Sequence, residues 1–342
     1  MEWIEPQFSR ERVNKAGIAL ANSNQSNEDI TVFHNWRSSH AYPMQVMIDF
    51  LRKNSLRIDK NSIVVQRLKR APSIINKLRR ESNMNLSRME DIAGCRAILS
   101  NLNKVRDLHR CLKDSRTNNI LYRERDYINN PKDSGYRGVH LVYRYNGAKD
   151  KFRNMNIELQ IRTKIQHSWA TAVEVIDTFT NQSLKSGNGD NKWLELFKCI
   201  GTEFSNLENF LANKINDYSN FDKIMDLTKE LHLFEKLSLF RISVKAITEN
   251  LSNETKNKES YFLINLDLNS KTGFYRTFRK DELEIATNIY NEFDDSNQKD
   301  KDIVLVSAKS LKELKKAYPN YFIDTKEFEK NLTKVINIYT SK

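Results

Sequence analysis

The sequence predicts an α+β protein in which a mixed β-sheet is flanked by helices, followed by connecting helices and a second, small α+β domain. Two observations lead to this prediction. Residues 91–180 alternate between strand patterns and helix patterns, which is typical of a sheet covered by helices. From residue 260 onwards, the segments 261–268 and 272–278 are two apolar and aromatic runs separated by the short polar segment NSK, which indicates a hairpin.

Each element of the first part is predicted from its own pattern. Apolar residues spaced three and four apart indicate helices, whereas residues alternating between apolar and polar indicate strands with one buried face. In chain order the sequence predicts helices at 41–55 and 73–82, a strand at 91–100, a helix at 103–115, strands at 139–145 and 156–163, and a helix at 164–179. Residues 18–40 receive no assignment.

The second part begins after a polar loop at 185–191 that is rich in Gly, Asn and Lys. Helices are predicted at about 192–216 and 222–249, then the hairpin, a helix near 280–292, a strand at 303–308, and helices near 309–317 and 325–339. Beyond residue 260 the chain has neither Cys nor His, so this domain cannot be a zinc module. We predict domains at 1–220 and 259–342, joined by helices over 221–258.

The net charge of +12 is concentrated in the first part of the chain. Residues 1–200 hold 34 Lys and Arg against 21 Asp and Glu, and residues 51–110 alone hold 15 against 5. This excess favours a polyanionic partner such as a nucleoside triphosphate or RNA, although a merely soluble basic surface is an alternative. No apolar stretch is long enough to span a membrane, and the N-terminus lacks a leader pattern, so we expect a cytoplasmic protein.

Two acids are placed to share a metal ion. Asp91 and Glu158 lie on two predicted strands of one sheet, and carboxylate oxygens are the ligands that Mg²⁺ prefers. Arg67, Lys69 and Lys77, with Ser73 between them near a helix start, could gather a triphosphate. Taken singly, each of these residues is more often an ordinary surface group, and no Walker-type loop is present. Their combination therefore carries the prediction.

The stretch 126-DYINNPKDSGYRGVHLVYRY-145 is the most specific segment. Gly135 permits a turn that a side chain would resist, which would place Tyr136 at an exposed tip. There its ring could stack on a base, a contact that contributes about 1–3 kcal/mol. Lys132 and Arg137 on either side could hold phosphate. The alternative is a plain turn with a core-facing tyrosine.

Four segments, RLKRAPSIINKL, DIAGCR, DYINNPKDSGYRGVH and ELQIRT, resemble the motifs of RelA/SpoT-type alarmone synthetases over about residues 60–180. The resemblance implies transfer of pyrophosphate from ATP to a ribose hydroxyl, with release of AMP. The chain has no His-Asp dipeptide, so we predict synthesis without hydrolysis. The implied roles are adenine stacking for Arg67 and Arg106, ATP phosphate contacts for Lys69, Ser73 and Lys77, Mg²⁺ binding for Asp91 and Glu158, activation of the hydroxyl by Glu158 with catalytic support from Gln160, base stacking for Tyr136, and acceptor contacts for Lys132, His140 and Arg162.

Residues 3–17 and 303–332 are similar to the CapRel group of fused toxin–antitoxin synthetases. That resemblance implies an enzyme that pyrophosphorylates the 3′ CCA end of tRNA and stops translation. It also implies a C-terminal pseudo-zinc-finger domain that restrains the enzyme until a phage protein, the major capsid protein in the best-known case, binds. Tyr318 and Tyr321 would block the adenine site in the closed state, unless they are core or helix-end aromatics. There are two alternatives to this function: a small alarmone synthetase making (p)ppGpp or (pp)pApp, and an RNA-binding module without activity.

Overall fold

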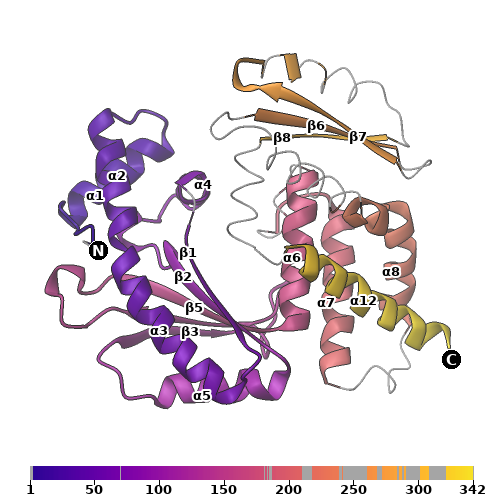
Figure 1. Ribbon diagram of the computed structural model, residues 1–342, viewed down its shortest axis with the longest axis horizontal. Helices are drawn as coiled ribbons and strands as arrows, with labels where there is room; N and C mark the ends of the chain where they lie inside the picture. Colours follow the sequence, from indigo (N-terminus) through magenta and orange to yellow (C-terminus); the bar gives the residue numbers. More distant parts are fainter. Residues whose placement is uncertain are drawn as a thin grey trace. The chain divides into compact units, whose positions relative to one another are not determined.

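The computed structural model describes residues 3–69, 71–180, 187–209, 218–238, 260–267, 272–282, 301–307 and 321–341, with residues 182, 184, 241, 285, 286 and 289 between them. The chain forms two compact units (Figure 1). The first contains residues 1–131 and 137–164, and the second contains residues 132–136 and 165–342. The tip of the loop at 126–138 therefore belongs to the second unit. The predicted domain boundaries at 220 and 259 stay predictions.

A five-stranded sheet forms the centre of the first unit, in the order β1-β2-β5-β4-β3. β2 and β5 run parallel, and the other neighbouring pairs are antiparallel, so the predicted mixed sheet is confirmed. The strands are β1 (Ile63–Leu68), β2 (Ala93–Leu99), β3 (Ile120–Asp126), β4 (Val139–Arg144) and β5 (Asn156–Thr163).

One face of this sheet is apolar because side chains alternate along each strand. Helices α3 (Ala41–Ile58) and α5 (Leu102–Asp114) pack on it, as predicted for 41–55 and 103–115. Each fully buried side chain of this kind contributes about 1.5–3 kcal/mol. The strand residues in this core are Ala93, Cys95, Ala97, Leu99, Val139, Leu141, Tyr143, Ile157, Leu159 and Ile161. The intervening residues of the strands face the opposite side, where the polar groups gather.

A second apolar cluster joins α1 (Arg10–Ala21), α2 (Asn27–Ser39) and α4 (Ala71–Arg80). Neither α1 nor α2 was predicted from the sequence. Ser26 begins α2 with a capping box: its side chain accepts a hydrogen bond from the backbone N–H of Asp29, whose carboxylate accepts one from the backbone N–H of Ser26. That Ser-x-x-Asp spacing in the sequence was the available signal for the start of α2.

The strands β1 and β3, which form the two edges of the sheet, were also missed. Arg67, to which the sequence assigned no element, lies on β1 and is paired with Gly94. Most of β3 is exposed or half-buried, so its sequence lacks the alternation that marks an internal strand. The described residues of the first unit also form the short 3₁₀ helices η1 (Leu86–Arg88) and η2 (Asp150–Phe152).

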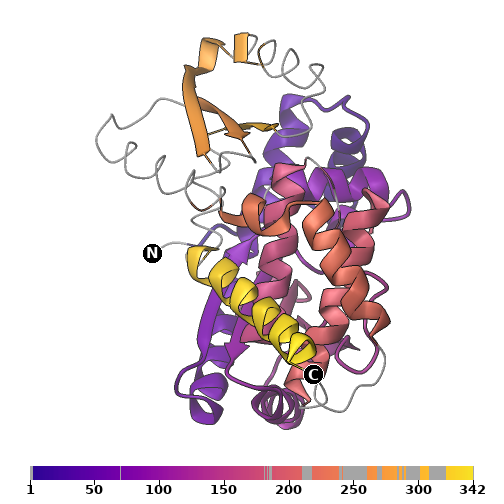
Figure 2. The ribbon, with the colours of Figure 1, turned by 90° about the vertical axis from the view of Figure 1, so that its right-hand side faces the viewer.

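The described residues of the second unit include the helices α6, α7, α8 and α12 and an antiparallel sheet in the strand order β7-β6-β8 (Figures 1 and 2). The predicted hairpin is confirmed as β6 and β7. The elements are α6 (Lys164–Phe179), α7 (Asn191–Glu208), α8 (Ser219–Glu230), β6 (Ser260–Asp267), β7 (Thr272–Arg279), η5 (Lys280–Glu282), β8 (Lys301–Ser307) and α12 (Tyr321–Thr340).

Some predictions lie outside the described residues. They concern the helix predicted at 309–317, most of the part beyond residue 238 of the helix predicted at 222–249, Tyr318, and the side chain of Tyr321. The C-terminal α12 packs on α7 within the second unit. Within the part of the chain that the structure describes, none of the helices combines the length and the apolar character needed to cross a membrane.

Candidate active site

The polar face of the first sheet is organised by strand register. Glu158 on β5 lies opposite Gly94 on β2, and Gln160 lies between Arg96 on β2 and His140 on β4. Since residues directly opposite one another share a face, the alternation that buries Leu159 turns these side chains to the other side. The parallel pairing of β2 and β5 brings together two motifs that are more than 60 residues apart.

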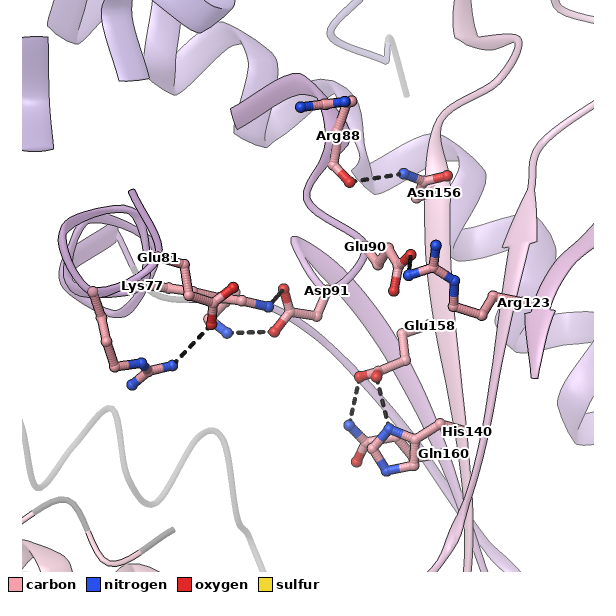
Figure 3. A network of polar contacts seen from close by, with 12 residues as sticks. Lys77, Glu81, Arg88, Glu90, Asp91, Arg123, His140, Asn156, Glu158 and Gln160 are labelled. Carbon is pink, nitrogen blue, oxygen red and sulfur yellow. Dashed lines mark hydrogen bonds and ion pairs between the residues drawn. The ribbon is translucent and has the colours of Figure 1, made fainter. Parts of the chain in front are cut away.

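Glu158 is a buried carboxylate, 9% exposed, with a partner on each oxygen (Figure 3). His140 Nδ1 lies 2.8 Å from Oε1, and the amide nitrogen of Gln160 donates to Oε2 at 2.6 Å. Burial alone would raise the pKa of Glu158, but His140 and Gln160 outweigh it and hold the pKa well below its ordinary value. Glu158 is therefore ionised at neutral pH.

Two arginines fix the orientation of Gln160. Its carbonyl oxygen accepts hydrogen bonds from Arg96 at 3.1 Å and from Arg162 at 2.9 Å. Because guanidinium groups only donate, the oxygen of the amide must face the arginines and its nitrogen must face Glu158. Arg96 received no predicted role, although its place in the segment DIAGCR, beside Asp91, was the available signal.

Asp91 precedes β2 and pairs with two lysines. Lys69 Nζ lies 2.5 Å from Oδ2, and Lys77 Nζ lies 3.0 Å from Oδ1. Burial would raise the pKa of Asp91, but the two ammonium groups outweigh it and lower the pKa. Burial lowers the pKa of Lys69, and Asp91 offsets that effect only in part. The structure thus brings together three residues that the sequence placed in two separate motifs.

The two carboxylates interact electrostatically. The charge of Glu158 raises the pKa of Asp91, and the charge of Lys69 lowers the pKa of both acids. Two ionised carboxylates on neighbouring segments fit a hard cation such as Mg²⁺, which takes oxygen ligands and completes its shell with water or phosphate. The described residues contain no cluster of three or more His, Cys, Asp or Glu that could hold a metal ion. Asp91 and Glu158 are the residues that would hold Mg²⁺ here.

Glu90 was not identified from sequence. Its carboxylate pairs with Arg123 at 2.8 Å (Figure 3) and with Arg125 at 2.8 Å, and these pairs connect the segment before β2 to the edge strand β3. Next to it along the chain, Asp91 points to the lysines instead. Consecutive acids therefore serve two networks, one on each side of the backbone.

The other predicted ATP residues lie on three elements. Arg67 is half-buried on β1, and its partner in register, Gly94, is in turn opposite Glu158. Ser73 and Lys77 lie one turn apart on α4. Arg106 on α5 donates to Asp126 and to Asn129, both at 2.6 Å, at the start of the loop. Its assignment to ATP stays a prediction.

The loop tip differs from the prediction. Tyr136 is 6% exposed, so it does not stand at an exposed tip. Its ring makes an edge contact with Trp169 at 6.3 Å between centroids, and Lys132 Nζ lies 5.4 Å from the ring centroid. Gly135 has φ +88°, which confirms that the turn requires glycine. The alternative of a core-facing tyrosine describes this structure, because α6 supplies the aromatic partner.

Residues 66–177 match the family model described as "Region found in RelA / SpoT proteins". Every predicted active-site residue from Arg67 to Arg162 falls inside this segment. The match supports a RelA/SpoT-type synthetase region, on the residues that form the polar face of the sheet.

Two curated relatives come from Bacillus subtilis (strain 168). GTP pyrophosphokinase YjbM is 35% identical over 115 residues, which cover 32% of this chain and 52% of the relative. GTP pyrophosphokinase YwaC is 32% identical over 111 residues, which cover 31% and 52%. The chain thus spans about half the length of these relatives.

Solved structures are also similar. The small alarmone synthetase 1 from Bacillus subtilis bound to its product pppGpp is 26% identical, with a TM-score of 0.42 and coverage of 50% of this chain and 91% of that chain. A GTP pyrophosphokinase family protein from Streptococcus pneumoniae is 21% identical, with a TM-score of 0.45 and coverage of 59% and 98%.

Proposed function

We propose that the protein is a pyrophosphotransferase of the small alarmone synthetase type, which moves pyrophosphate from ATP to a ribose hydroxyl. The observation that carries the proposal is the buried, ionised Glu158, held by His140 and Gln160 on the strand next to the Asp91–lysine cluster. The match of residues 66–177 to the RelA/SpoT region supports the same class of reaction.

In this reaction the hydroxyl oxygen attacks the β-phosphorus of ATP, and the bond from that phosphorus to the oxygen bridging to the α-phosphate breaks. AMP leaves, and the hydroxyl proton passes to Glu158. The low pKa of Glu158 makes it a weak base in the free protein. Bound triphosphate adds negative charge, which acts to raise the pKa of Glu158, whereas Mg²⁺ held by the same carboxylate would act to lower it. His140, at 2.8 Å, is placed to share the proton.

The lysines of the site change partner when ATP binds. Lys69 and Lys77 pair with Asp91 in the free protein, and the triphosphate competes for the same ammonium groups. Mg²⁺, for which Asp91 and Glu158 would supply oxygens, contributes neutralisation of phosphate charge when bound. Arg67 and Arg106 are proposed to hold the adenine, and Ser73 to contact the phosphates.

The acceptor has two candidates. A guanine nucleotide is favoured by the curated relatives, which are named GTP pyrophosphokinases. The 3′ CCA end of tRNA, in a toxin that a phage protein activates, is favoured by the excess of Lys and Arg over residues 51–110, which suits a polyanionic acceptor. In that case residues 259–342 act as the pseudo-zinc-finger regulatory domain and Tyr318 and Tyr321 as its switch.

The test uses the full chain with ATP labelled at the γ-phosphate and with GDP, GTP, ATP and deacylated tRNA offered separately. Each acceptor is tried with and without phage major capsid protein, for wild type and Glu158→Gln. Label in a nucleotide without the capsid protein supports the alarmone synthetase, and label in tRNA only with it supports the restrained toxin. If wild type and Glu158→Gln bind RNA equally and neither transfers label to any acceptor, the proposed reaction is contradicted.

A further inference from the structure

Two glycines from distant parts of the chain meet at the loop tip. A Cβ atom built on Gly201, in the middle of α7, would lie 2.7 Å from the backbone oxygen of Gly135. A Cβ atom built on Gly135 would lie 2.9 Å from Cα of Lys198 and 3.0 Å from the oxygen of Phe197. Contacts below 3.0 Å do not occur without displacement of one side, and here both sides are backbone. The loop tip and the helix therefore touch main chain to main chain.

A glycine at this position is unfavourable for the helix itself. Glycine in the interior of a helix is less favourable than alanine because it loses more backbone freedom on folding. Gly201 is buried in the middle of α7, where an alanine would strengthen the helix if nothing lay against it. The approach of the Gly135 carbonyl is the structural reason why a side chain does not fit.

The loop tip has internal hydrogen bonds, and it packs on α7, which is in turn hydrogen-bonded to α6. Gly135 N–H donates to the Lys132 oxygen at 2.8 Å, and Lys132 N–H donates to the Tyr136 oxygen at 3.2 Å. The indole N–H of Trp169, whose ring contacts Tyr136, donates to the Phe197 oxygen on α7 at 2.9 Å. The tip, α6 and α7 thus form one packed arrangement within the second unit.

The C-terminal helix α12 also packs on α7. Phe328 of α12 contacts Phe197 at 6.3 Å and Phe204 at 5.4 Å between ring centroids, and it is fully buried. Phe197 is also the residue whose backbone oxygen lies against Gly135. A displacement of α12 would therefore act on the segment of α7 that supports the loop tip.

We propose that Gly201 is a positioning residue for acceptor binding: α7 seats the tip at 132–136 through the Gly135–Gly201 contact, and thereby sets the orientation of Tyr136 and Lys132. The proposal deepens the proposed function and rests on it for the identity of the bound acceptor. The seating of the tip itself is independent of any activity.

Hydrogen exchange on wild-type protein tests the seating first. The Gly135 and Lys132 amides, which lie within the tip, are expected to exchange as slowly as the amides in the middle of α7. In Gly201→Ala, exchange over 132–136 is expected to accelerate at least on the order of 10-fold, while β2 and β5 stay unchanged. A wild-type tip that exchanges freely, or a tip unchanged in the variant, overturns the proposal even if the protein is an active synthetase.

Kinetics then test the link to the acceptor. In Gly201→Ala the KM for the acceptor is expected to rise on the order of 10-fold, with the KM for ATP within about 2-fold of wild type. Thr202→Ala, a truncation on the same helix beside it, serves as the control and is expected to match wild type in both measurements. Equal changes in both KM values, or a change confined to kcat, would overturn the proposal. If the wild-type protein itself transfers no pyrophosphate, the proposed function is contradicted instead.

Discussion

His140 Nδ1 lies 2.8 Å from Glu158 Oε1, and both residues are buried, at 9% exposure each. This pair decides the charge state of the site, because a carboxylate at this depth without partners would take up a proton. The hydrogen bond from Gln160 adds to it, and Arg96 and Arg162 orient that amide. Residues on three strands thus keep Glu158 ionised.

Replacing His140 by alanine should destabilise the fold at neutral pH. The variant leaves a buried carboxylate with one partner fewer, a change that typically costs about 3–5 kcal/mol. The free energy of unfolding is measured by urea denaturation at pH 7, with the exposed His34→Ala as the control. An equal, small effect in both variants would show that the pair contributes little.

The same variant should respond to pH in a defined direction. In wild type the pKa of Glu158 lies below its unfolded value, so its contribution to stability is present above about pH 4.5 and is lost as the pH falls further. In His140→Ala the pKa of Glu158 rises, so protonation relieves the penalty at a higher pH. The difference in unfolding free energy between the two proteins should therefore shrink between pH 7 and pH 4. A constant difference across this range would contradict the assignment.

Gly94→Val should preserve the fold and block ATP. A Cβ atom built on Gly94 meets only the Glu158 backbone oxygen, at 3.8 Å, so there is room on the strand. The added side chain would lie in the row between Arg67 and Glu158. We expect ATP affinity to fall on the order of 10-fold or more by calorimetry, with unchanged or slightly higher stability because β-branched residues suit strands. Gly94→Ala is the size control, and full ATP binding by the valine variant would exclude this row from the nucleotide site.

Asp91→Asn should separate nucleotide binding from turnover. The substitution removes the anion between Lys69 and Lys77, so both ammonium groups become available to the triphosphate. Metal-free ATP, measured in EDTA, is expected to bind as tightly as to wild type or more tightly. Pyrophosphate transfer with Mg²⁺ is expected to fall about 10²–10³-fold, because a proposed metal ligand is lost. Weaker metal-free binding would mean that Asp91 organises the lysines and does not compete with phosphate.

Tyr339→Phe should loosen the attachment of the C-terminal helix. The Tyr339 hydroxyl donates to Glu203 of α7 at 2.9 Å, and Glu203 is 1% exposed. Loss of a hydrogen bond to a buried carboxylate typically costs about 1.5–3 kcal/mol, which urea denaturation would detect. Tyr218→Phe is a matched control, since the Tyr218 ring contacts Tyr339 and is 38% exposed. Identical stability of the two variants would contradict a specific role for the Glu203 contact.

The elements predicted correctly from the sequence are those whose burial follows a simple period. β4 and β5 have one face in the core, so alternation revealed them, and α3 and α5 each present one apolar stripe to the sheet. The edge strands β1 and β3 lack a clear buried face, and their charged residues serve the site and the Glu90 network. Their sequences therefore predicted no strand.

The site was predictable in its residue types but not in its contacts. Asp91, Glu158 and the lysines were found from motifs, whereas the pairing of Arg96 with Gln160 depends on the parallel register of β2 and β5. The burial of Tyr136 depends on Trp169 and on the close approach of Gly201, which follow it by more than 30 and 60 residues. Local sequence around the loop contains no information about either partner.

The Lys69–Asp91–Lys77 cluster has a consequence for the kinetics of nucleotide capture. An isolated pair of lysines would create a positive field that accelerates the encounter with a triphosphate at low ionic strength. Here Asp91 sits between the two ammonium groups and cancels part of that field before the nucleotide arrives. The contribution of this cluster to the encounter rate should therefore depend only weakly on salt. Selection among ligands then occurs at close range, when the ligand replaces Asp91 as the partner of the two lysines. Only a ligand with both phosphate charge and the right geometry can do so.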